Sequence, residues 1–419
     1  MPAAAVPVLS SPSPAQRIDG GLPQGIWALG WVSMLMDVSS ELVHSLLPVF
    51  MATTLGASMV FIGIVEGVAE GAAAITKVFS GAISDYLGKR KLLAVAGYAL
   101  GALAKPIFPL AATMGWVFTA RFVDRLGKGI RGAPRDALVA DIAPPQLRGA
   151  AYGLRQALDA VGAFIGPLLA LGLMFWLAGN IQAVLWAAVP PAFLAVFVLI
   201  VAVHEPRVSG HAAESRGRLR LADAGRLPPR YWMVVALAAV FALARFSEAF
   251  LILRARDVGL AVGWVPAIMI VMNVVYSLLA YPAGAAADRL SARTLLVFGL
   301  GVLVVADLSL AMAPSPTMVF WGAALWGLHM AFTQGLLAKL VADTAPADLR
   351  GSAFGVFNLV NGLALLLASL IAGYLWSTLG AGATFIAGAS FAALAAVGLL
   401  LYRPKGPDPG QPAGGHLGT

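Results

Sequence analysis

Two acidic residues and a histidine share one face of the first hydrophobic segment. Asp37, Glu41 and His44 are spaced four and three residues apart, which places them within about 60° of arc on a helix. Such a face can carry a proton, because a carboxylate in a low-dielectric cavity can exchange its proton when a charged partner arrives or leaves. Two carboxylates and an imidazole are also an acceptable partial ligand set for a divalent transition metal.

Basic residues dominate one face of a later hydrophobic segment, near residues 115–141. Arg121, Arg125 and Lys128 lie on the same side of this helix, and Asp124 lies at the edge of that side. An ionisable group at the membrane centre costs at least about 2.5 kcal/mol, so each of these groups is expected to face a cavity or a partner. Because Arg suits carboxylates and phosphates, recognition of an anionic substrate stays open.

Further polar residues within hydrophobic segments are candidates for the same cavity. They are Glu66, Glu70, Arg155, Asp159, Arg245, Glu248, Asn273, Tyr276, His329, Gln334, Asn358 and Asn361. For the charged members, the alternative to a cavity role is an ion pair that holds helices together. Only His329 could add a second imidazole from within a hydrophobic segment, and a metal site would then require the two parts of the chain to close around the ion.

The composition places these side chains in a membrane. The chain has 419 residues, of which 60% are hydrophobic and 11% charged, less than half of the roughly 25% charge of soluble domains. About 250 hydrophobic residues, at about 20 per bilayer span, correspond to roughly twelve spans. The lack of Cys excludes a disulfide scaffold, a thiolate zinc site and thiol catalysis.

Hydrophobic runs between short polar turns predict an all-α integral membrane protein with twelve helices. Six are expected near 25–54, 57–84, 92–112, 115–141, 148–176 and 181–203, and six near 230–253, 262–287, 293–312, 316–342, 351–376 and 381–402. The predicted domains are a disordered tail (1–24), an N-terminal six-helix bundle (25–204), a cytoplasmic linker (205–229), a C-terminal six-helix bundle (230–403) and a second disordered tail (404–419).

Positive residues predict the orientation of these helices. Lys and Arg in short loops are retained on the cytoplasmic side, and the turns with Lys89, Arg148 and Arg293 all fall on one side. The opposite turns lack both residue types, apart from Arg254 and Arg256. We therefore expect a multi-pass protein of a bacterial cytoplasmic membrane, with both termini in the cytoplasm. The net charge of +8 then reflects cytoplasmic loops, and no nucleic-acid partner is expected.

The two halves of the sequence repeat each other. LVADIAPPQLRGAAYG, at Leu138–Gly153, aligns with LVADTAPADLRGSAFG, at Leu340–Gly355, with about eleven identities in sixteen positions. Parallel repeats of six helices place a cavity between the halves, near the bilayer midplane, that can open to either side. This arrangement is typical of transporters.

Glycines and charged residues recur at fixed spacings in two short turns. The first set is Gly81, Asp85, Gly88, Lys89 and Arg90, and a degraded second copy lies at Asp288 and Arg293. This spacing resembles the loop signature between the second and third helices of the major facilitator superfamily. Gly162, Gly166 and Pro167 resemble the start of the fifth-helix motif that the family associates with antiporters, although Ala170 and Leu171 replace its final glycines. The resemblance covers about residues 25 to 402.

The resemblance implies twelve helices in two halves related by a pseudo-twofold axis, and transport by alternating access. In the family's drug/proton antiporters, first-helix acids that face a fourth-helix Arg are implicated in proton coupling, and Asp37, Glu41 and Arg121 match that layout. The alternative for these residues is a permanent salt bridge that holds the first and fourth helices together. Asp85 and Arg90 would latch the halves on the cytoplasmic side, and the alternative for them is a role in membrane topology alone. The antiporter-like glycines have close helix packing as their alternative.

We therefore expect a secondary transporter that exports a small molecule in exchange for protons. A divalent-metal exporter using Asp37, Glu41 and His44, or an organic-anion transporter using the Arg-rich fourth helix, remains an alternative. No phosphate-binding loop, zinc-protease or serine-hydrolase motif is present, so an enzyme is not expected. The expected partners are the substrate, protons and membrane lipid, with no cofactor and a monomeric state.

Overall fold

A computed structural model describes residues 21–205, 225–333, 336–346 and 349–401. All the regular elements in these residues are helices. Most of the two predicted tails and of the predicted linker, as well as Gln334, lie outside the described residues.

The described residues of the first half of the chain form eight α-helices. These are α1 (Gln24–Val49), continued by a π-helical turn at Phe50–Thr54, α2 (Met59–Leu87), α3 (Arg90–Ala104), α4 (Ile107–Leu110), α5 (Met114–Ile142), α6 (Arg148–Trp176), α7 (Ile181–Trp186) and α8 (Val189–Ala202). Pro106 lies between α3 and α4, where it cannot donate the backbone hydrogen bond that would continue the helix.

In the second half, the described residues also form eight α-helices. These are α9 (Pro229–Ala244), α10 (Ala249–Asp257), α11 (Pro266–Arg289), α12 (Ala292–Ala311), α13 (Pro316–Thr333), α14 (Leu336–Thr344), α15 (Arg350–Leu379) and α16 (Ala381–Leu401). The helix predicted over 230–253 is interrupted at residues 245–248, between α9 and α10. No Pro or Gly marks this break, so local sequence signals did not predict it.

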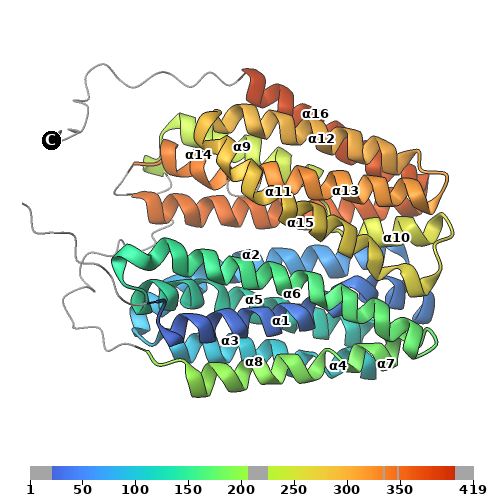
Figure 1. Ribbon diagram of the computed structural model, residues 1–419. Coiled ribbons are helices and arrows are strands. Elements are labelled where there is room, and N and C mark those ends of the chain that lie inside the picture. The colour runs from blue at the N-terminus through green and yellow to red at the C-terminus, as the bar shows by residue number, and fades with distance from the viewer. Residues whose placement is uncertain (1–20, 206–224, 334–335, 347–348, 402–419) are drawn as a thin grey trace, which may run out of the picture.

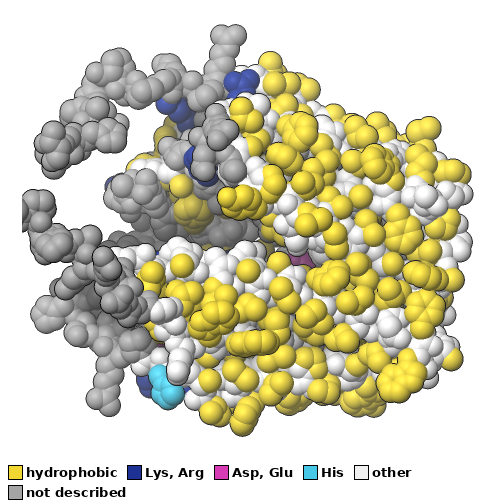
Figure 2. All heavy atoms as spheres, in the orientation of Figure 1, with side chains coloured by type: hydrophobic (Ala, Val, Ile, Leu, Met, Phe, Trp, Pro, Cys, Tyr) yellow, Lys and Arg dark blue, Asp and Glu magenta, His cyan; other side chains and the backbone are white. Residues whose placement is uncertain are grey.

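Ten segments of the described chain are long and apolar enough to cross a membrane. The segment of α5 does not qualify because its charged residues are too dense. On the visible face, hydrophobic side chains cover most of the surface, and Lys and Arg gather at one end (Figure 2). The apolar exterior, with charge at its end, is the surface expected of a membrane-spanning bundle.

The helices form two groups that lie side by side (Figure 1). The group α1–α8 packs against the group α9–α16, with α2 against α15 and α6 against α11 at their boundary. The beginnings of α1 and α9 and the ends of α8 and α16 all lie at one end of the molecule, on the left in Figure 1. We call this the terminal end and the opposite one the far end.

Glycines allow the close contact between α2 and α15. A Cβ atom on Gly67 would lie 2.7 Å from the carbonyl oxygen of Leu366, and one on Gly63 would lie 2.4 Å from that of Ser369. With Gly71, these residues form a G-x-x-x-G-x-x-x-G pattern that lets two helix backbones approach. We call the contact of these three glycines with α15 the glycine seam.

The hydrophobic cores differ between the two ends. One core cluster is shared by both groups and includes Leu46, Phe50, Phe250 and Trp376, which lie toward the far end. Toward the terminal end, each group has its own cluster, with Leu29 in the first group and Tyr231 in the second. The groups are therefore closed against each other at the far end, and they separate toward the terminal end.

Candidate functional site

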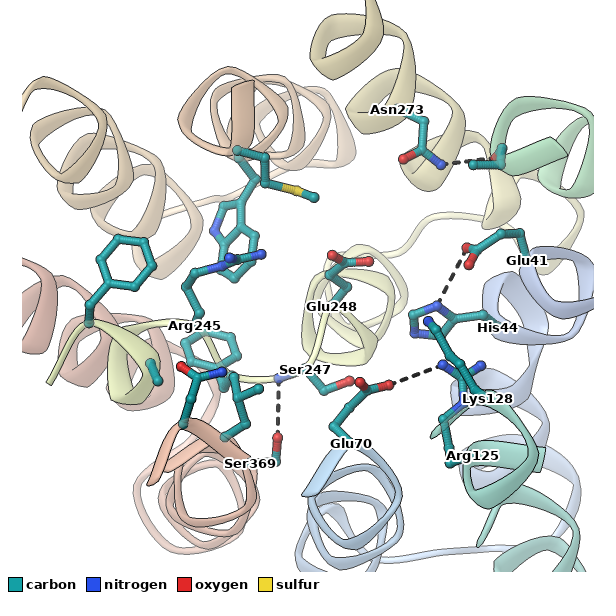
Figure 3. Close-up of a pocket in the computed structure, with 18 residues that line it drawn as sticks. Glu41, His44, Glu70, Arg125, Lys128, Arg245, Ser247, Glu248, Asn273 and Ser369 are labelled. Carbon is teal, nitrogen blue, oxygen red and sulfur yellow. Dashed lines mark hydrogen bonds and ion pairs between the residues drawn. The ribbon is translucent and has the colours of Figure 1, made fainter. Parts of the chain in front are cut away.

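A cavity of about 370 Å³ lies between the two groups of helices (Figure 3). From the first group it is lined by Glu41, His44, Glu70, Arg125, Lys128 and Ala163, and from the second by Phe241, Ala242, Arg245, Phe246, Ser247, Glu248, Asn273, Trp326, Met330, Asn361, Leu365 and Ser369. Charged residues of both signs therefore face one space between the two helix groups, as expected for ionisable groups within a membrane.

A second cavity of about 410 Å³ adjoins the first and shares Glu41, Glu70 and Lys128 with it. Its other charged lining residues are Asp37, Lys77, Arg131, Arg135 and Asp159. Because these residues lie nearer the terminal end of their helices, the two cavities form a path that leads from the middle of the molecule toward that end.

The break between α9 and α10 brings backbone and polar side chains to the cavity. Arg245, Ser247 and Glu248 all come from residues 245–248. The Ser247 backbone nitrogen donates to Oγ of Ser369 at 3.2 Å, which satisfies one group that the break frees from helical bonding. Non-helical backbone at membrane depth is tolerated where it lines a cavity, and transporters use such broken helices at their binding sites.

Glu66 of α2 joins the two groups of helices. Its Oε2 atom accepts hydrogen bonds from Arg121 of α5 at 2.7 Å and from Oγ of Ser247 at 3.1 Å. Glu66 is fully buried and Arg121 is 1% exposed. Arg121 also lies 3.8 Å from Glu70, which lines the cavity. Two carboxylates thus share one guanidinium, and one of them also binds the other half of the chain.

The sequence-based pairing of Arg121 is therefore corrected. Arg121 was expected to face Asp37 and Glu41, but its ion-pair partners among the described residues are Glu66 and Glu70. The helical face was predicted from a single helix, whereas the partner depends on which neighbouring helix that face meets, and α5 packs on α2. Glu41 instead lies 3.6 Å from Nδ1 of His44, three residues along α1.

A buried lysine belongs to the same network of charges. Lys105, between α3 and α4, has no exposed surface and donates to Asp124 at 2.8 Å and to Ser40 at 3.0 Å. Asp124 also pairs with Arg125 at 3.2 Å. The sequence analysis did not select Lys105, although a lone Lys within the apolar run GALAKPIFP is a clear signal.

Other candidates divide between the cavities and the protein interior. Those that line a cavity are Asp37, Glu41, His44, Glu70, Arg125, Lys128, Asp159, Arg245, Glu248, Asn273, Tyr276 and Asn361. Neither of these two cavity linings includes Glu66, Asp124, Arg155, His329 or Asn358, so a cavity role for these residues stays a prediction. Arg155 pairs with Asp159 at 2.5 Å, one helical turn away, which is the structural alternative for this pair.

His329 contacts the backbone of its own helix group. It is fully buried, and its Nδ1 lies 2.8 Å from the carbonyl oxygen of Gly299. Within the described residues, no group of three or more His, Cys, Asp or Glu side chains could hold a metal ion.

The loop motif is only partly described. Gly88 caps α2 with a φ of +61°, which favours glycine. Arg90 pairs with Asp141, and its guanidinium also donates to the carbonyl oxygen of Ala137. Both of these partners lie on α5 of the same helix group. The side chains of Asp85 and Asp288 lie outside the described part, so the latch stays a prediction; Arg293 donates to the carbonyl oxygen of Leu400.

The antiporter-like glycines place α6 against the acidic face of α1. A Cβ on Gly162 would lie 2.6 Å from the carbonyl oxygen of Met34, and one on Gly166 would lie 2.7 Å from that of Val38. The same added atoms would approach the Cβ atoms of Asp37 and Glu41 within 3.0 Å. Close packing is thus their visible role, and it fixes the positions of both acids.

The family model of the Major Facilitator Superfamily matches residues 29–274 and 249–418. The chain belongs to the major facilitator superfamily. An uncharacterized MFS-type transporter of Methanocaldococcus jannaschii is 32% identical over 391 residues, which cover 91% of this chain and 95% of the relative. The multidrug resistance protein MdtL of Escherichia coli is 24% identical over 346 residues, 82% of this chain and 85% of the relative.

Solved structures show the same superfamily fold. A D-xylose-proton symporter superposes with a TM-score of 0.73 at 15% identity, covering 91% of this chain and 98% of that chain. A bacterial homolog of the human lysosomal transporter Spinster, in an inward-facing and unoccupied conformation, has a TM-score of 0.70 at 16% identity, covering 91% and 97%. This member of the superfamily is thus a multi-pass secondary transporter of small molecules and not an enzyme.

Proposed function

We propose that this transporter exports a small molecule in exchange for protons, and that Glu66 couples the two movements. The observation that carries the proposal is the double hydrogen bond of Glu66, to Arg121 in its own helix group and to Ser247 in the other. An ionised carboxylate binds both donors strongly, because hydrogen bonds to charged groups contribute about 1.5–3 kcal/mol.

The bond holds the empty carrier closed at the far end. Ser247 can stay on Glu66 only while the break between α9 and α10 remains close to α2, as it does in this conformation. A proton on Glu66 weakens both bonds. A substrate that binds Arg245, Ser247 or Glu248 in the cavity displaces the same contact. A carrier that changes conformation only when loaded with a proton or with substrate is an exchanger.

Asp37 and Glu41 are proposed to pass protons between Glu66 and the solvent. Both line cavities that lead to the terminal end, and Glu70 lies between that path and Arg121. If the terminal end is cytoplasmic, as the positive loops predict, protons leave Glu66 toward the cytoplasm. We further propose that the transporter is a monomer in a bacterial cytoplasmic membrane. Its two six-helix bundles are the domains that move against each other. The name of the relative MdtL supports export as the direction.

Purified protein in liposomes with an internal pH dye tests the proposal. Lipophilic cations, organic anions and divalent metals are added in turn to wild type, Asp37→Asn, Glu41→Gln and Glu66→Gln. One class is expected to move protons in wild type, and the movement should fall at least about tenfold in the variants. Asp257→Asn is the matched control, since Asp257 pairs with Arg254 at the far end of α10, away from both cavities. Substrate flux without proton movement in wild type would contradict antiport.

A further inference from the structure

The central cavity presents equal numbers of acidic and basic side chains. Its carboxylates are Glu41, Glu70 and Glu248, and its cations are Arg125, Lys128 and Arg245. Two of the acids already have partners, because Glu70 pairs with Arg125 at 3.3 Å and Glu41 lies 3.6 Å from His44. The remaining charges decide what the cavity can bind.

Three of these charged groups have no ion pair within the described part of the chain. They are Lys128 on the wall formed by the first helix group, and Arg245 and Glu248 on the opposite wall. All three line the central cavity (Figure 3). The Nε atom of Arg245 is buried and has no hydrogen-bond partner among the described residues. Charged groups at this depth are costly unless they are paired or hydrated, so a ligand that pairs them is favoured.

We propose that the transported molecule is amphoteric, with an anionic group that binds Arg245 or Lys128 and a cationic group that binds Glu248. This inference rests on the proposed function only in taking the cavity as the transport site. A simple cation would pair with Glu248, but it would be repelled by Lys128 and Arg245. A simple anion would pair with Lys128 or Arg245, but it would be repelled by Glu248. A molecule with both signs complements the charges of both walls.

The cavity also has room and an apolar side for such a molecule. A volume of about 370 Å³ lies within the usual range of small-molecule pockets, roughly 300–1,000 Å³. Phe241 and Phe246 line the cavity beside Arg245, and the guanidinium of Arg245 lies 5.9 Å from the centre of the Phe241 ring. The body of the ligand between its charged groups can therefore be apolar.

Equilibrium dialysis of the detergent-purified full chain at neutral pH tests this proposal. Two matched series are used. Norfloxacin, a zwitterion, is compared with its ethyl ester (a cation) and its N-acetyl derivative (an anion), and phenylalanine, also a zwitterion, is compared with phenethylamine (a cation) and N-acetylphenylalanine (an anion). Wild type is expected to bind at least one zwitterion about tenfold more tightly than either of its singly charged derivatives.

Substitution of an acidic or of a basic lining residue should then shift the charge preference of the cavity in opposite directions. Glu248→Gln should lose about tenfold in zwitterion affinity and gain affinity for the N-acetyl anion, whereas Arg245→Gln and Lys128→Gln should favour the cation of each series. Glu248→Asp should keep the wild-type order, and Asp257→Asn should change nothing. A wild-type preference for a singly charged compound, an equal loss for all three forms in Glu248→Gln, or no binding of any compound would overturn the proposal. Because dialysis needs no proton gradient, it succeeds or fails independently of proton coupling.

Discussion

The hydroxyl of Ser247 donates a 3.1 Å hydrogen bond to Oε2 of Glu66, and so connects the break between α9 and α10 to the buried face of α2. The same oxygen accepts a bond of 2.7 Å from Arg121. One carboxylate is thus hydrogen-bonded both to its own helix group and to the opposite one. This connection relates a proton-binding group to the conformation of the whole transporter.

Removal of the Ser247 hydroxyl is expected to let the two helix groups separate at the far end. Ser247→Ala loses a hydrogen bond to a charged acceptor, which contributes about 1.5–3 kcal/mol. The conformation in which the two helix groups are separated at the far end should therefore gain about tenfold or more in population. The chain has no Cys, so Thr54→Cys and Thr317→Cys introduce unique spin-label sites, one in each helix group. Electron–electron distance measurements should show a longer distance in Ser247→Ala. An unchanged distribution would argue against the connection.

The glycine seam should respond to a single methyl group. Gly67→Ala places a Cβ 2.7 Å from the carbonyl oxygen of Leu366, so α2 and α15 must separate and the same spin-label distance should lengthen. Gly301→Ala on α12 is the matched control, because its added Cβ has no atom within 4 Å. Gly to Ala in a free helix position stabilises by up to about 1 kcal/mol, so the control should not lower the unfolding temperature. If Gly67→Ala and Gly301→Ala had the same spin-label distance and the same unfolding temperature, the close packing of the glycine seam would be contradicted.

Lys105→Met is expected to destabilise the first helix group strongly. It leaves Asp124 buried without its closest cation, and breaking a buried pair typically lowers the free energy of unfolding by about 3–5 kcal/mol. Thermal unfolding in detergent should show a clear loss, and adding Asp124→Asn should recover part of it. If the double variant were as unstable as the sum of the two single variants, the two residues would not interact.

Asp307 holds the Trp326 ring in the second helix group. Both residues are fully buried, and Trp326 Nε1 donates to Oδ1 of Asp307 at 2.9 Å. Asp307→Leu removes the acceptor and should lower the free energy of unfolding by about 1–3 kcal/mol, whereas Asp307→Asn keeps an acceptor oxygen and should lose less. Thermal unfolding of both variants measures the difference. A larger loss in the Asn variant would show that the carboxyl group itself is required.

The hydrophobic segments and their approximate bounds could be predicted because each depends on a local run of hydrophobic residues. The cavity role of Glu41 and Lys128 could also be predicted, since charge within a span must face a partner or water. Lys105, Asp307 and the glycines of the seam carried equally local signals that the sequence analysis did not use.

Other features depend on contacts that no local pattern contains. The break at residues 245–248 has no Pro or Gly, and it is held by Ser369 from a helix more than a hundred residues away. Arg121 binds α2 instead of α1 because α5 packs on α2. The pairing of helix faces is a tertiary property, so the sequence indicated the side of each helix but not its partner.

The number of protons moved per substrate tests the central claim most directly. Substrate flux and internal pH are followed together in liposomes that contain wild type, Glu66→Gln or Asp257→Asn. Wild type and Asp257→Asn should move protons against substrate in a fixed ratio, whereas Glu66→Gln should still exchange labelled for unlabelled substrate but move no protons. An unchanged ratio in Glu66→Gln would contradict the account, because the proton would then bind elsewhere.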